Sequence, residues 1–70
     1  MLYVLTTYPD YGRYYVHADE NLFKFVGFGE VYYTRENDDE RSDKDFIRET
    51  AQAYLDECGL GQEVNEVRRL

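Results

Sequence analysis

The sequence predicts an α+β fold, an antiparallel β-meander of three to four strands covered on one face by a C-terminal helix, with a short second helix. Strand-type residues fill the first half of the chain, where turn signals recur every eight to ten residues. The second half holds an apolar stripe at helical spacing. We expect a single domain over 1–70, with the antiparallel sheet in 1–35, the main helix in 42–59 and the short terminal helix in 61–70.

Two strands are predicted before residue 20. Residues 2–8 are rich in β-branched and aromatic residues, and residues 13–18 alternate, with Tyr14, Val16 and Ala18 on one face. Pro9-Asp10-Tyr11-Gly12 predicts the turn between them, because proline presets φ and glycine supplies a positive φ. The polar residues 19–21 end the second strand.

The strongest strand character lies in residues 22–34, LFKFVGFGEVYYT. Gly27-Phe28-Gly29 predicts a tight hairpin between Leu22–Val26 and Glu30–Thr34, which completes a four-stranded meander. One alternative stays open. In this alternative, residues 19–25 form a short helical turn instead of a strand, and the sheet has three strands, the third of them long and bent.

Residues 42–59 carry clear helix signals. Ser42 is predicted to be the N-cap, Asp45 completes a capping-box-like arrangement, and Gly59 ends the helix. The apolar positions form one stripe, on which we expect a buried cysteine. They are Phe46, Ile47, Thr50, Ala51, Tyr54, Leu55 and Cys58.

The last ten residues are less regular. Val64, Val67 and Leu70 recur every three residues, which favours a short second helix over 61–70. A last edge strand over 66–70 is the alternative.

The charge is strongly uneven along the chain. Eight basic and fifteen acidic residues give −7, and residues 36–70, with eleven acids and five bases, hold −6 of it. An acidic surface repels phosphate backbones and anionic membranes and favours basic partners, although acidic surfaces also serve solubility alone. We therefore expect a protein partner with a basic surface, no direct nucleic acid binding and no membrane association.

No motif for catalysis, cofactor binding or metal binding stands out. The acids of 36–45 lack the central glycine and the carboxylate spacing of a calcium loop. His17 and Cys58 are each alone of their kind, so we expect neither an enzyme nor a cofactor. A single cysteine excludes an internal disulfide, and the N-terminus lacks the features of a signal peptide, which together indicate the cytoplasm.

Residues 27–33 partly resemble the RNA-recognition-motif signature. The glycines, Phe28, Val31 and Tyr33 match that signature. However, Val26 stands at its basic position and Glu30 at its central stacking aromatic. That fold also needs a helix between its first two strands, so RNA binding is not expected.

Tyrosines and carboxylates are the candidate partner-binding groups. Alternation sends the neighbours Tyr14-Tyr15 and Tyr32-Tyr33 to opposite sheet faces, so some rings stay exposed, either as interface anchors or as cross-strand shielding. The acids of 36–45, continued along the helix, can present a row of negative charge to a groove that normally holds DNA or RNA. The predicted partner-binding residues are Glu36, Asp38, Asp39, Glu40, Asp43, Asp45, Glu49, Tyr15 and Tyr33.

In this combination of small size, acidity and aromatic content, the whole chain resembles the phage-encoded anti-CRISPR inhibitors and related DNA-mimicking proteins. The class shares no single fold, so no family residue is transferred. The resemblance implies an inhibitor that binds an effector subunit of a bacterial CRISPR complex at its basic nucleic-acid-binding surface and blocks target DNA binding, in the cytoplasm of the bacterial host. For a chain of this size we expect a monomer or a homodimer. The alternative is a generic interaction module or antitoxin-like regulatory subunit that uses an exposed Tyr-rich sheet face.

Overall fold

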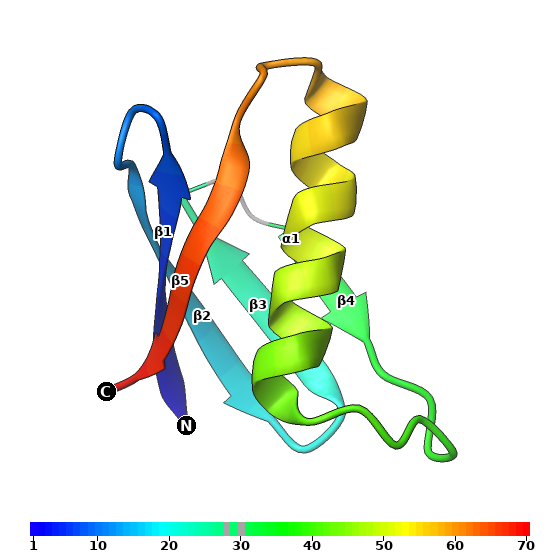
Figure 1. Cartoon of the computed structure of the whole chain (residues 1–70). Coiled ribbons are helices and arrows are strands. Elements are labelled where there is room, and N and C mark those ends of the chain that lie inside the picture. The colour runs from blue at the N-terminus through cyan, green and yellow to red at the C-terminus, as the bar shows by residue number, and fades with distance from the viewer. Residues whose placement is uncertain (28, 30) are drawn as a thin grey trace.

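The computed structural model describes residues 1–27, 29 and 31–70, and within them it shows a five-stranded antiparallel sheet with one helix on one face (Figure 1). The strand order is β4-β3-β2-β1-β5, and every neighbouring pair is antiparallel. The α+β class is therefore confirmed. The elements are β1 (Leu2–Tyr8), β2 (Arg13–Asp19), β3 (Leu22–Val26), β4 (Val31–Thr34), α1 (Asp43–Cys58) and β5 (Glu63–Arg69).

The first four strands form the predicted meander. Residues Leu22–Val26 are a strand paired with both β2 and β4, so the alternative of a helical turn over 19–25 is wrong. In the last hairpin Phe23 lies opposite Tyr33 and Phe25 opposite Val31. The predicted turn at 27–29 includes Phe28, which lies outside the described residues.

The short second helix predicted over 61–70 is wrong, because Glu63–Arg69 form the edge strand β5. The alternative of a last edge strand over 66–70 is the correct one, although the strand begins three residues earlier. Leu5 lies opposite Val67 and Thr7 opposite Val64, and the register shifts between Thr6 and Thr7. Two positions on β1 therefore span three on β5. Such a bulge lets residues three apart face the same side of a sheet. The helix-like spacing of the valines is thus the spacing of a bulged strand.

The caps of α1 agree with the prediction. The Ser42 side chain accepts a hydrogen bond from the Asp45 backbone N–H at 3.2 Å. Gly59 adopts φ 67°, a left-handed conformation in which its N–H reaches the carbonyls of Leu55 and Asp56. The helix therefore begins and ends where its local sequence chemistry indicates.

The core lies between α1 and the covered sheet face. Phe23 and Phe46 meet there with ring centroids 4.6 Å apart, and both are buried. The apolar stripe of α1 is buried as far as Leu55. Cys58, which was expected to be buried, is exposed, because it is the last residue of the helix and lies beyond Leu55.

Within the described part of the chain, the other sheet face has no helix against it (Figure 1). Alternation and register place Tyr8, Tyr15, Val26 and Tyr32 on this uncovered face, and all four are exposed. In residues 1–27, 29 and 31–70, no helix combines the length and the hydrophobicity of a membrane span.

Candidate protein-binding surfaces

The acidic segment consists of the loop after β4 and the helix α1. Residues 35–58 hold nine acids and four bases, a net charge of −5 out of the −7 of the chain. The loop runs from the end of β4 to the start of α1 (Figure 1). Its carboxylates differ in their surroundings, which decides what each can do.

Arg41 binds two of the predicted site carboxylates. Its Nε donates to Asp39 Oδ1 at 3.0 Å and its Nη1 lies 3.3 Å from Glu49 Oε1, so it ties the loop to the outer side of α1. The guanidinium also lies 4.9 Å from the centroid of the Phe46 ring. The Arg41 hydrogen bonds lower the pKa of Asp39 to about 2.

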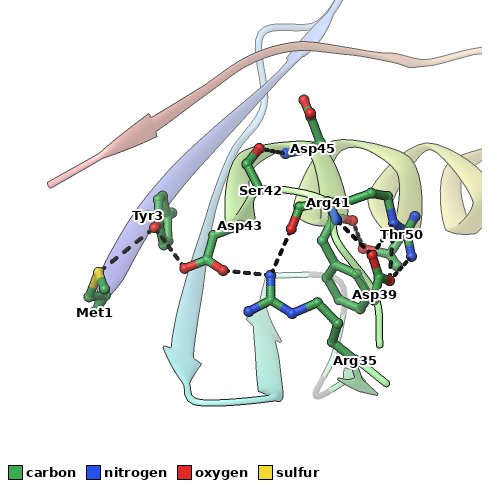
Figure 2. Close-up of polar contacts among 10 residues, drawn as sticks. Met1, Tyr3, Arg35, Asp39, Arg41, Ser42, Asp43, Asp45 and Thr50 are labelled. Atoms are coloured by element: carbon green, nitrogen blue, oxygen red, sulfur yellow. Dashed lines mark hydrogen bonds and ion pairs between the residues drawn. The ribbon is translucent and has the colours of Figure 1, made fainter. Parts of the chain in front are cut away.

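Arg35 binds a third carboxylate, as Figure 2 shows. Its Nη1 lies 2.7 Å from Asp43 Oδ1 and donates to the backbone carbonyl of Arg41 at 3.3 Å. The Tyr3 hydroxyl donates to the other Asp43 oxygen at 3.1 Å. Burial and, next, this bond to Asp43 raise the pKa of Tyr3.

Asp39, Asp43 and Glu49 therefore each have a partner within the molecule. They fix the loop against the sheet and the helix, and their charge is largely neutralised by arginine. Sequence reasoning counted all acids alike and missed Arg35 and Arg41. The available signal was that an arginine stands on either side of the acids of 36–40.

Four other predicted site carboxylates are exposed and form no ion pair with any described residue. We call this set the free carboxylates: Glu36, Asp38, Glu40 and Asp45. The first three lie in the loop and Asp45 lies in the first turn of α1. Because the arginines hold that loop in place, the free carboxylates stand on a fixed part of the backbone.

Tyr15 and Tyr33, the two predicted aromatic site residues, lie on opposite faces of the sheet. Tyr15 is on the uncovered face, whereas Tyr33 is half-buried on the covered face, with its ring centroid 5.4 Å from that of Phe25. Burial, and then the negative charge of Glu57, raise the pKa of Tyr33. The two rings cannot contact one flat partner surface together. Tyr32, rather than Tyr33, shares the face of Tyr15.

Tyr54 and Cys58 lie one turn apart at the C-terminal end of α1. A hydrogen bond with Cys58 is the main cause that raises the pKa of Tyr54.

Within residues 1–27, 29 and 31–70 there is no cluster of three or more His, Cys, Asp or Glu side chains fit for a metal ion, and no pocket is found.

In comparisons with known proteins, no family model, curated protein or solved structure matched this chain.

Proposed function

We propose that the protein is a small acidic binding protein that docks its free carboxylates on a basic, nucleic-acid-binding surface of a protein partner. Inhibition of the anti-CRISPR kind, in which target DNA is kept off an effector subunit, is the specific form of this proposal. The observation that carries it is the set of Glu36, Asp38, Glu40 and Asp45, exposed and without an ion pair to described residues.

Two physical arguments support this assignment. First, negative charge gathered on one segment speeds encounter with a cationic groove and competes there with phosphate groups. Second, the Arg35 and Arg41 contacts hold the loop in the conformation that presents the charges. A preorganised loop loses less conformational entropy on binding than a mobile one.

A matched charge-reversal experiment tests the proposal. The flank variant carries Glu36→Lys, Asp38→Lys and Glu40→Lys. The control variant carries Asp19→Lys, Glu63→Lys and Glu66→Lys, exposed residues of the sheet, and has the same net charge. Displacement of labelled target DNA from bacterial CRISPR effector complexes is measured at low and raised salt.

We expect the flank variant to lose displacement by at least about tenfold, because several phosphate-like contacts are reversed. The control variant should compete nearly as well as the unmodified protein, and raised salt should weaken both. Equal loss in the two variants would show that only net charge matters. No displacement by the unmodified protein would remove the inhibitor form of the proposal.

A second candidate function is an interaction module that uses the uncovered sheet face. The observation in its favour is that Tyr15, Tyr32, Leu22 and Val26 are exposed together there, 38–53% each. Exposed tyrosines of this kind are common interface anchors. If alanine at Tyr15 and Tyr32 abolishes partner binding while the flank variant binds normally, the interaction module is the correct function.

A further inference from the structure

The two edge strands of the sheet are unequally protected. On β5, the Val64 backbone N–H donates to Gln52 Oε1 at 2.9 Å and its carbonyl accepts from Arg48 Nη1 at 3.4 Å. Four of its seven residues are charged: Glu63, Glu66, Arg68 and Arg69. Charged side chains and covered backbone groups are the usual means of preventing strand addition at an edge.

The β4 edge lacks these protections. Its residues are Val-Tyr-Tyr-Thr, with no charge and no proline. The backbone N–H of Arg35 donates to the backbone carbonyl of Asn21 at 2.7 Å, so the backbone of Arg35 faces the neighbouring strand β3. Because facing and outward residues alternate in an antiparallel pair, the backbone groups of Tyr32 and Thr34 point outward. No described residue hydrogen-bonds to them.

Negative charge lies at the end of this open edge. The loop that carries Glu36, Asp38 and Glu40 directly follows β4 and extends beyond it (Figure 1). The Asn21 side-chain amide donates a hydrogen bond to Asn37 Oδ1, which ties the loop to the β2–β3 turn. An extended segment added along β4 therefore meets carboxylates at one end, and lysines or arginines in that segment are complementary to them.

We propose that β4 accepts an extended, basic segment of the partner as an added strand. Tyr32 and Thr34 supply two N–H donors and two carbonyl acceptors for the main chain of this segment, while the free carboxylates of the loop bind its basic side chains. The inference rests on the proposed function, since it specifies how a basic partner is held. It adds a requirement that the proposed function does not have, a peptide main chain able to donate hydrogen bonds.

The test uses an acetylated peptide of four Val-Lys repeats as the probe, followed by isothermal titration calorimetry and by the amide chemical shifts of the protein. A second peptide is N-methylated at alternate residues, which removes main-chain donors and keeps the charge. In the protein, Thr34→Pro removes an outward N–H, a replacement that edge strands tolerate, and Thr34→Val is its matched control. Circular dichroism checks the fold of both variants.

We expect the unmodified peptide to bind with the largest shifts at the Tyr32 and Thr34 amides. N-methylation and Thr34→Pro should each weaken binding about tenfold, and Thr34→Val should change it little. Equal binding of the two peptides, or no binding of either, overturns strand addition, and the peptide comparison holds even if Thr34→Pro does not fold. A dimer that Thr34→Pro dissociates would make a second copy the occupant and also overturn it.

The outcomes separate this inference from the proposed function. If the Glu36, Asp38 and Glu40 reversal abolishes DNA displacement and Thr34→Pro leaves displacement unchanged, the acidic surface is correct and strand addition is wrong. If neither variant affects displacement or peptide binding, both are wrong.

Discussion

Two groups of carboxylates lie within residues 36–49 and differ in their surroundings. Asp39 and Asp43 are bound by arginine, whereas Asp38 and Glu40, one residue away from Asp39, form no ion pair with any residue that the structure describes. The first group builds the loop and the second is presented by it. The number of acids in a segment therefore does not define a binding surface, because the placement of the arginines divides those acids into a bound and a free group.

The bound group is more than a set of surface ion pairs. The Arg35 side chain is only 17% exposed and its guanidinium lies 5.2 Å from the Phe23 ring centroid. It also reaches Asp43 and a backbone carbonyl. An exposed ion pair contributes about 0–1 kcal/mol, whereas removing one partner of a pair shielded by rings costs more, because the other charge is left partly buried without its partner. Stability should therefore respond to the bound group and binding to the free group.

The largest expected effect is that of Arg35→Ala. The replacement removes the ion pair, the bond to the Arg41 carbonyl and the packing over Phe23, and it leaves Asp43 without its cation. We expect a loss of about 2 kcal/mol in the free energy of unfolding. For a domain of this size that corresponds to a melting temperature lower by about 10 °C, measured by calorimetry.

Asp38→Ala is the matched comparison within the loop. Asp38 is exposed and forms no ion pair with the described residues. The free energy of unfolding of the Asp38→Ala variant should therefore stay within about 0.5 kcal/mol of that of the unmodified protein. If the two variants lose stability equally, the division between bound and free carboxylates is incorrect.

Tyr3→Phe has a smaller expected effect. It removes only the hydroxyl that donates to Asp43, which should lower the unfolding free energy by about 1 kcal/mol. The folded state raises the pKa of Tyr3, so its contribution is complete below the unfolded pKa, near 10, and is lost as pH rises through the folded value. Urea titrations from pH 8 to 11 should therefore show a flatter alkaline decline for Tyr3→Phe. An unchanged decline would contradict the role given to Tyr3.

Local sequence chemistry predicted the parts of the fold that depend on neighbouring residues. Ser42, Asp45 and Gly59 fix the ends of α1 through contacts within a few residues, and these ends were predicted correctly. The last strand was only the alternative to a short helix, because the spacing of Val64 and Val67 reflects a bulge opposite Thr6 and Thr7. A bulge is set by pairing with a strand far away in the sequence.

The candidate site was harder to predict for the same reason. Tyr3 and Asp43 are forty residues apart, and nothing local indicates that they meet. Which of two adjacent tyrosines shares a face with Tyr15 depends on the register across two turns. That register places Tyr32, and not Tyr33, on the same uncovered face as Tyr15, with β3 between their strands. Alternation predicts opposite faces for neighbours but does not identify the covered one.

The smallest expected effect is the pH dependence of Asp39→Asn, which compares the two carboxylate groups directly. The folded pKa of Asp39, about 2, is below its usual value near 3.9, since Arg41 stabilises the charged form. Its contribution is therefore present above pH 4 and is lost as pH falls towards 2. In Asp39→Asn the acid decline of unfolding free energy should be flatter, and the two curves should converge near pH 2. Glu40→Gln, which alters a free carboxylate, should retain the slope of the unmodified protein, and a slope as flat as that of Asp39→Asn would place Glu40 in the bound group.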